Sequence, residues 1–170
     1  MDAMDAILSR RSIRKYTAEQ VPEKMLNELL AAAMSAPSAH NVQPWHFVLV
    51  NDRAILDEIP KHHPYADMLK DAPLAIVVCG DLQLDNGREF WVQDCAAATE
   101  NILIAAQAKG LGAVWVGIHP VEKESAAVIR KLIGLPEHIV PLCLIPMGYP
   151  AQTKSPANRY DLSKVHHNQW

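Results

Sequence analysis

A short basic segment near the N-terminus carries the side chains best suited to bind an anion. Arg10, Arg11, Arg14 and Lys15 place four cations within six positions, and Ser12 lies between them. Guanidinium groups match the geometry of a phosphate, and a serine hydroxyl adds a further donor. The whole chain is mildly acidic, with 16 Lys and Arg against 19 Asp and Glu. One dense basic segment in an acidic chain predicts a site for a small anion such as a terminal phosphate, with a solvated basic turn as the alternative.

A second polar segment, Pro37–Trp45, has the composition of a recognition loop. It reads PSAHNVQPW, with a proline on each side of its polar part. The prolines restrict the backbone, and the amide and hydroxyl side chains both donate and accept hydrogen bonds. These properties suit recognition of a flat heteroaromatic ring with mixed polar edges. A rigid loop with a purely structural role is the alternative.

Composition excludes several classes of protein. A chain of 170 residues with 49% hydrophobic and 21% charged residues is typical of one globular domain, residues 1–170. The net charge of −3 argues against general nucleic-acid binding. No apolar run is long enough to span a bilayer, and the first residues are acidic where a signal peptide is basic. Three widely spaced cysteines, Cys79, Cys95 and Cys143, predict buried, reduced thiols in a cytoplasmic protein without a membrane partner.

Other catalytic and binding motifs are absent or incomplete. Gly110 and Gly112 follow a helix and precede a strand, which is the reverse of a dinucleotide-binding fingerprint. The chain has no phosphate-binding P-loop and no GxSxG sequence. The pairs His62-His63 and His166-His167 lack further ligands at metal-binding spacing, so we predict no metal site. Three tryptophans in apolar segments are interpreted as core residues: Trp45, Trp91 and Trp115.

Helical and strand patterns alternate along the chain, which predicts an α+β fold with a mixed sheet and flanking helices. We expect a polar C-terminal tail over residues 150–170. The predicted helices cover 2–9, 22–36, 52–59, 88–109 and 121–133, and the predicted strands cover 45–50, 73–79, 113–118 and 140–147, the last interrupted by Pro141 and Pro146.

The predicted helix at 88–109 is apolar around its whole circumference rather than along one stripe. Such a helix has to be buried on all sides. Its alanines permit close approach of another helix, so a partner subunit could cover its outer face. A central core helix within one subunit is the alternative.

Four segments, taken in order, resemble the FMN-dependent nitroreductase family. They are RRSIRKY, APSAHNVQPWHF, GLGAVWVG, and GYP followed by an arginine. The resemblance covers essentially the whole chain. It implies an α+β homodimer with a mixed, mainly antiparallel central sheet, two FMN molecules at the subunit interface, and the 150–170 tail packed on the partner subunit.

The resemblance also implies the cofactor-binding residues. The phosphate and ribityl groups would be held by Arg10, Arg11, Ser12, Arg14 and the C-terminal Arg159, with Lys154 as a further cation. The isoalloxazine ring would be approached from the other subunit by Pro37, Ser38, Ala39 and Asn41, with Gln43 touching the ring or ribityl chain. The backbone of Val116 and Gly117 would face the N5/O4 edge of the flavin.

Three differences from the family pattern affect the predicted pocket. Tyr65 and Met68 stand where longer members carry an asparagine and a lysine near the flavin pyrimidine edge, and Ala157 stands where a lysine is frequent. The chain is short, so a helical excursion that covers the active site in larger members is expected to be missing. We predict that Tyr65 and His40 border an open substrate pocket.

The resemblance implies an oxidoreductase that passes electrons from NAD(P)H through FMN to nitroaromatic, quinone or similar acceptors by a ping-pong mechanism. Because the flavin carries the chemistry, no catalytic acid, base or nucleophile is expected from the protein. Two alternatives stay open. One is a relative with other flavin chemistry, such as reductive dehalogenation or flavin destruction. The other is a non-catalytic FMN-binding or redox-sensing dimer.

Overall fold

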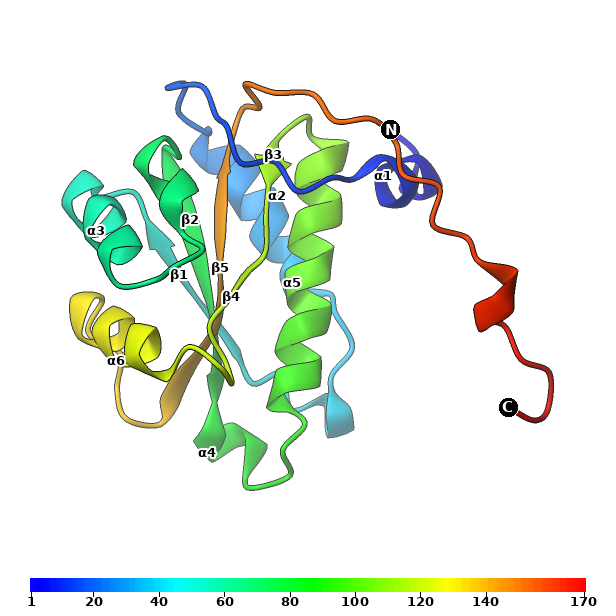
Figure 1. Ribbon diagram of the computed structural model, residues 1–170. Coiled ribbons are helices and arrows are strands. Elements are labelled where there is room, and N and C mark those ends of the chain that lie inside the picture. Colours follow the sequence, from blue (N-terminus) through cyan, green and yellow to red (C-terminus); the bar gives the residue numbers. More distant parts are fainter.

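The computed structural model describes all 170 residues, and its helices surround one antiparallel sheet (Figure 1). Short 3-10 turns lie at Ala39–Asn41, Ile59–Lys61, Asp67–Lys70 and Leu162–Lys164. The helices are α1 (Ala3–Ser9), α2 (Glu23–Met34), α3 (Arg53–Glu58), α4 (Leu82–Asp85), α5 (Trp91–Ala108) and α6 (Lys123–Leu132). The strands are β1 (Trp45–Val50), β2 (Leu74–Asp81), β3 (Gly112–Ala113), β4 (Val116–Gly117) and β5 (Ile139–Gly148).

The sheet has the order β1-β2-β5-β3, with β4 also paired to β5. Every pair of strands is antiparallel. The one parallel contact is an isolated bridge between Ser12 and Ala113. The α+β class with a mainly antiparallel central sheet is therefore confirmed.

Two strand predictions need correction. The single strand predicted at 113–118 is two short strands, β3 and β4, which pair with different parts of β5. The predicted interruption of the last strand is also wrong, since β5 runs without a break through both prolines. Proline lacks an N–H and is tolerated in a sheet where a ladder bond is missing. Pro141 lies at the register shift opposite Val78 and Cys79, and Pro146 faces the gap between β3 and β4.

The core lies on both faces of the sheet. Successive side chains of a strand point to opposite faces, and all eight residues of β2 are buried. Leu74, Ile76 and Val78 pack into one cluster with residues of α2 and α5. Ala75 and Val77 pack into the other, with residues of α3 and α6. The sheet is thus covered by helices on both sides within a single chain.

α5 begins at Trp91, three residues later than predicted. Asp85 is buried, and its carboxylate accepts hydrogen bonds from the backbone N–H groups of Glu89 (2.7 Å), Phe90 (3.1 Å) and Trp91 (3.0 Å). A carboxylate at this position compensates the unpaired donors of a helix N-terminus. The intervening Glu89 has a positive φ of 63° and cannot belong to the helix.

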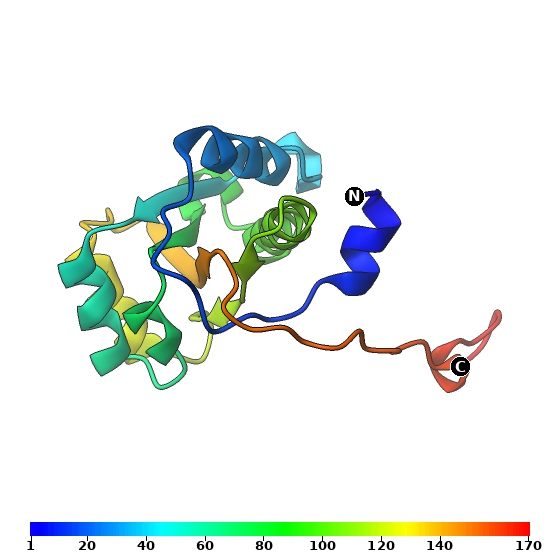
Figure 2. The same cartoon turned by 90° about the horizontal axis from the view of Figure 1, so that it is seen from above.

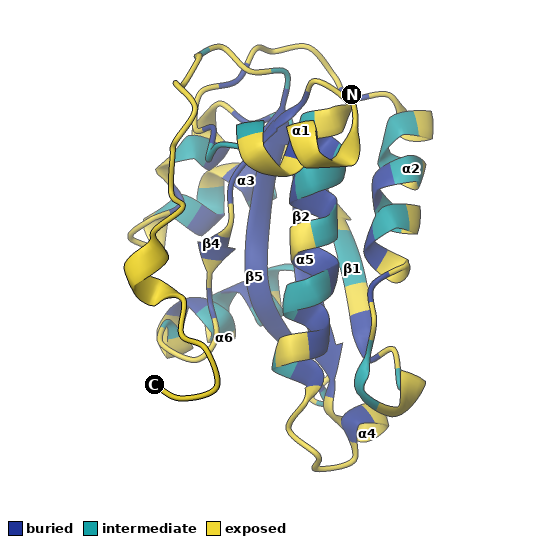
Figure 3. Ribbon diagram, turned by 90° about the vertical axis from the view of Figure 1, so that its right-hand side faces the viewer, coloured by how far each residue is buried: buried dark blue, intermediate teal, exposed yellow.

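Only one face of α5 is fully buried within the chain. The buried positions recur at helical spacing from Trp91 to Ala106, and the intervening apolar residues are half-buried or exposed. α1 lies along this outer side, and the tail after Pro150 leaves the body beyond α1 (Figures 2 and 3). No helix is both long and apolar enough to cross a membrane.

Candidate functional site

The basic segment is anchored to the sheet by the residues between its cations. Ile13 is buried, and its N–H donates to the carbonyl of Ala113 (3.0 Å). Gly112 allows this approach, because a Cβ atom there would lie 2.6 Å from Cγ2 of Ile13. Tyr16 is also buried, and its hydroxyl donates to the carbonyls of Ile13 (2.6 Å) and Pro146 (3.1 Å). The chain between these anchors is therefore held in one extended conformation.

The extended conformation sends alternate side chains to opposite sides of the segment. Arg11 and Ile13 line a cavity of about 280 Å³ beside the start of the tail. Arg14 lines a different cavity next to β4. Arg10 points toward α5, where its Nε lies 3.5 Å from Oε1 of Glu100. The three arginines of the segment that were predicted to bind the phosphate therefore do not converge on one point within the chain.

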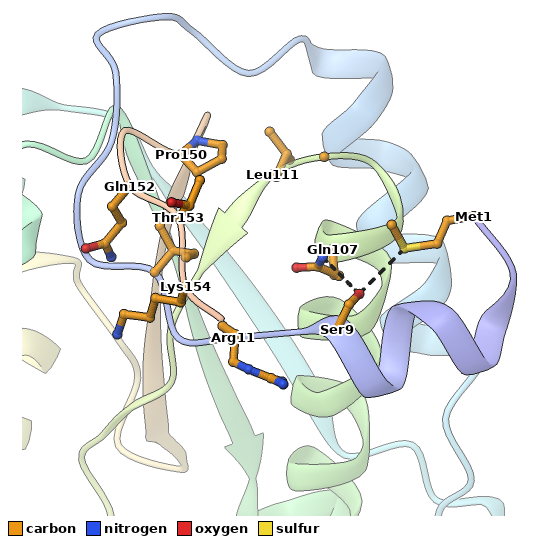
Figure 4. A pocket seen from close by; sticks show the side chains of 11 residues that line it. Met1, Ser9, Arg11, Gln107, Leu111, Pro150, Gln152, Thr153 and Lys154 are labelled. Atoms are coloured by element: carbon orange, nitrogen blue, oxygen red, sulfur yellow. Dashed lines mark hydrogen bonds between the residues drawn. The ribbon is translucent and has the colours of Figure 1, made fainter. Parts of the chain in front are cut away.

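The guanidinium group of Arg11 donates its hydrogen bonds to backbone carbonyls. Its Nε donates to Ser155 (3.0 Å), and its Nη1 donates to Leu8 (3.1 Å) and Arg10 (2.5 Å). The Arg11 side chain lies between the N-terminal segment and the tail residues that include Lys154 (Figure 4). These contacts tie the start of the tail to the end of α1. Of the three guanidinium nitrogens of Arg11, only Nη2 has no hydrogen-bond partner.

Arg14 opens onto a groove that is suited to a flat ligand. The groove has a volume of about 430 Å³. Gly117 is exposed, and a Cβ atom at this position would meet nothing closer than Nε1 of Trp115 at 4.0 Å. No protein contact explains the glycine, whereas close approach of a ligand to the backbone would. The groove is lined by Arg14, Tyr65, Asp67, Met68, Trp115, Val116 and Gly117.

Trp115 is the pocket residue that the sequence interpretation placed wrongly. It was expected in the core with Trp45 and Trp91, which are indeed buried. Trp115 instead leaves 37% of its surface exposed and lines the groove. Its apolar neighbours Val114 and Val116 are buried, and the side chain between them points the other way, as alternation along an extended segment requires. That alternation was the available signal.

The loop between α2 and β1 has an unusual backbone. His40, Asn41 and Gln43 have positive φ values of 53°, 56° and 53°. Such conformations are costly for residues other than glycine and persist where the surroundings enforce them, frequently at functional sites. The loop is held by Gln43 N–H donating to Ser38 Oγ (3.0 Å) and by Gln43 Nε2 donating to Asn41 Oδ1 (2.8 Å).

The loop contacts the start of α5, Arg10 of the basic segment contacts its middle, and Ser9 contacts its end. The N–H of Ala39 donates to Oδ1 of Asp94 (2.9 Å), near the start of the helix. Gln107, near its end, donates to Ser9 Oγ (3.1 Å). Arg10 of the basic segment lies beside Glu100, six positions after Asp94, which is about 9 Å along the helix axis at 1.5 Å per residue. None of the five main cavities combines residues of both segments.

One chain therefore assembles only part of the predicted site. It brings Arg14, Tyr65, Val116 and Gly117 together in one groove. His40 and the other loop residues lie elsewhere, as the predicted origin of this loop in the second subunit requires. Arg159 is exposed on the tail and lines none of the main cavities.

Comparison with known proteins finds relatives over the whole length of the chain. Residues 7–63 and 60–149 match the nitroreductase family. A protein of Methanothermobacter thermautotrophicus, provisionally named NADH dehydrogenase/NAD(P)H nitroreductase, is 48% identical over 170 residues, which cover 100% of this chain and 88% of that protein. The chain belongs to the nitroreductase family.

Solved structures of nitroreductase-family relatives share the fold over the full chain. A protein of Bacteroides thetaiotaomicron with the same provisional name is 47% identical, with a TM-score of 0.94 over 99% of this chain and 98% of that one. A provisionally identified nitroreductase of Desulfovibrio desulfuricans, solved in complex with FMN, is 31% identical, with a TM-score of 0.88 over 100% and 98% of the two chains. The resemblance seen in the sequence motifs is therefore confirmed.

Proposed function

We propose that this nitroreductase-family protein is an FMN-dependent oxidoreductase that takes electrons from NAD(P)H and delivers them to nitroaromatic, quinone or similar acceptors. The observation that carries the proposal is the groove with Arg14, two aromatic side chains and an exposed glycine whose Cβ position is empty. The FMN in the structure of the Desulfovibrio desulfuricans relative and the NAD(P)H in the name of the archaeal one support the choice of cofactor and electron donor.

The side chains of the groove fit the parts of FMN. Arg14 supplies a cation for the phosphate, and Arg10, which would have to leave Glu100, and Ser12 would add a second cation and a hydroxyl for the phosphate and ribityl groups. Val116 and Gly117 offer backbone groups at an edge that a planar ring can approach closely, because Gly117 has no side chain. Tyr65 and Trp115 add exposed aromatic surface beside that edge. Met68 and Tyr65 carry no charge, so backbone groups take the place of charged side chains at the pyrimidine edge.

We further propose that the complete site forms between two copies of the chain. Pro37, Ser38, Ala39, Asn41 and Gln43 of one subunit would reach the ring bound by the basic segment of the other. Arg159 would reach the phosphate from the tail, which packs on the partner subunit. Two observations support this: no main cavity of one chain combines residues of both segments, and the apolar residues on the outer face of α1 are exposed.

When bound, FMN supplies the redox chemistry, accepting hydride at N5 and returning electrons to the second substrate. The protein contributes anchoring, orientation and backbone donors that favour negative charge on the reduced ring. His40 and Tyr65 border the open space where NAD(P)H and the acceptor would bind in turn. One site used successively by two substrates predicts ping-pong kinetics.

The absorption spectrum of the purified protein is the first test. We expect a flavin band, FMN released by heat, bleaching of the band by NADH or NADPH without oxygen, and its return on addition of a quinone. A protein that binds FMN but is not bleached by either nucleotide would be a binding or sensing dimer. Failure to bind added FMN, judged by unchanged Trp115 fluorescence against a Trp115→Phe control, would contradict the proposal.

A further inference from the structure

A buried histidine beside the groove has no role in the chemistry described so far. His63 is 2% exposed, although its neighbour His62 is exposed and pairs with Glu58 (3.0 Å). A buried imidazole needs partners for both ring nitrogens. His63 has both, and the two partners, Tyr65 and Gly117, line the groove.

The hydrogen bonds define which ring nitrogen carries the proton. The backbone N–H of Tyr65 points at Nδ1 (3.2 Å), so Nδ1 is the acceptor. Nε2 lies 2.9 Å from the carbonyl oxygen of Gly117, which can only accept, so Nε2 carries the hydrogen. His63 is therefore the neutral tautomer protonated on Nε2, and it spans from Tyr65 to Gly117.

The bond to Gly117 matters because of what otherwise holds β4. This strand has two residues, and its glycine has more conformational freedom than any other residue. The N–H of Ile118 donates to Leu142 (2.9 Å), and His63 donates to the carbonyl of Gly117. The Gly117–Ile118 peptide is thus held at both ends, and His63 supplies one of the two bonds.

The segment that carries His63 is itself held in place by a hydrogen bond from α6. Ser125 of α6 is buried, and its hydroxyl donates to the carbonyl of His62 (2.6 Å). Tyr65 follows Pro64, which restricts the backbone between them. His63 thus connects a supported loop to a two-residue strand whose other backbone partner is β5.

We propose that His63 is a positioning residue for the flavin groove: its Nε2–H and its Nδ1 fix the Gly117 carbonyl and the Tyr65 backbone relative to each other. The inference rests on the proposed function, since the groove is taken to be the FMN site. A fixed Gly117 backbone holds the donors of the β4 segment toward the flavin edge, and donors held in place favour the reduced, negatively charged ring. Loosening Gly117 should lower the affinity for reduced FMN more than that for oxidised FMN.

Two substitutions separate the two hydrogen bonds. In His63→Gln, the amide nitrogen can replace the Nε2 donor but the Nδ1 acceptor is lost. In His63→Asn, the side-chain oxygen can replace the Nδ1 acceptor but the donor to Gly117 is lost. His62→Gln is the matched control, because His62 lies next to His63 but binds Glu58 at the surface.

The midpoint potential of bound FMN reports the effect on Gly117. In His63→Asn we expect the affinity for reduced FMN to fall about tenfold more than the affinity for oxidised FMN. For a two-electron couple, this corresponds to a midpoint potential about 30 mV lower than that of the wild type. His63→Gln should restore a value near that of the wild type, and His62→Gln should match it. A wild-type potential in His63→Asn would overturn the proposal.

Ring-nitrogen chemical shifts of His63 in FMN-free wild-type protein provide a test that needs neither a variant nor the cofactor. We expect the shifts of a neutral ring protonated on Nε2, and slow exchange of the Tyr65 amide. A ring protonated on Nδ1, or on both nitrogens at neutral pH, would overturn the proposal even if both variants failed to fold. If His63 of the wild type shows the expected protonation on Nε2 but the protein binds no FMN, the proposed function would be refuted. The two hydrogen bonds of His63 to Tyr65 and Gly117 would still stand.

Discussion

Apolar residues are buried in the interior around β2 and β5, but many are exposed on the outer surface formed by α1, α5 and the tail. All residues of β2 and all but one of β5 are buried by helices of the same chain. On α1, by contrast, Met4, Ile7 and Leu8 are 57%, 46% and 63% exposed. Figure 3 shows both regions, with buried strands behind a largely exposed α1. The interior is covered within one chain, whereas the apolar outer face of α1 is not.

This difference implies that stability and cofactor binding can be changed separately. Substitutions in the interior should lower the free energy of unfolding. Substitutions on the outer surface should weaken assembly or FMN affinity and leave the interior packing unchanged. The predictions below start from the largest expected effect.

Ile76→Ala should produce the largest loss of stability. Ile76 is fully buried in β2, and removing such a side chain costs about 2–5 kcal/mol of unfolding free energy. Urea unfolding at one fixed protein concentration measures it, since assembly also contributes to stability. The control is Val121→Ala, at an exposed position, where we expect a change within about 0.5 kcal/mol. Equal midpoints for the two variants would show that the sheet is not the core.

Leu8→Glu should weaken dimerisation. The side chain is exposed in one chain but is proposed to lie in the interface, where a charge would be desolvated. We expect the dimer dissociation constant to rise by about 10–100-fold, which is about 1.4–2.8 kcal/mol. Sedimentation over a concentration series measures it, with Asp5→Glu, which keeps the charge on the same helix, as control. A folded, FMN-loaded monomer of the wild type at micromolar concentration would contradict the dimer proposal.

Arg14→Ala should weaken FMN about tenfold or more, because a charge-assisted hydrogen bond contributes roughly 1.5–3 kcal/mol. Riboflavin lacks the phosphate and should bind the variant and the wild type with similar affinity. Fluorescence titration with both flavins distinguishes the phosphate from the ring as the group that Arg14 binds. An equal loss of affinity for riboflavin would show that Arg14 binds the ring rather than the phosphate.

The three thiols should not react with thiol reagents in the folded protein. Burial raises the pKa of Cys79 and Cys143 to about 12, and it also raises the pKa of Cys95. At pH 8 a thiol reagent should label them only after unfolding. Unfolded thiols lose their protons near pH 8.5 while the folded ones keep theirs, so stability should fall from about pH 8.5 to pH 12. Rapid labelling of native protein would show that the interior opens.

The sequence was informative where local pattern decides the structure. The strand at Trp45–Val50 was predicted to the residue, because β-branched and aromatic residues lie between two turns. The basic segment and the Pro37–Trp45 loop were predicted to be binding segments from their composition, and this stays a prediction. The start of α5 was missed because it depends on Asp85, which reaches across a turn that contains Glu89 in a positive-φ conformation.

Long-range contacts explain the remaining misses. The division of the 113–118 strand depends on its partner β5. Alternation along the segment could have placed Trp115 outside the core, but the groove that it lines is made from three distant segments. The role of His63 needs Gly117, which is more than fifty positions away, to lie beside it. That no main cavity combines the loop with the basic segment is likewise visible only in three dimensions.

A heterodimer of two complementary variants tests the central claim, that two subunits build each site. One subunit carries Arg10→Ala and Arg14→Ala, the other carries Asn41→Ala and Gln43→Ala, and the pair is isolated through two different affinity tags. In a two-fold symmetric dimer, one site then receives both altered segments and the other receives none. We predict a single tight FMN site per heterodimer, with wild-type affinity, whereas each homodimer binds weakly. Two weak sites and no tight one in the heterodimer would show that each chain binds FMN alone and would contradict the account.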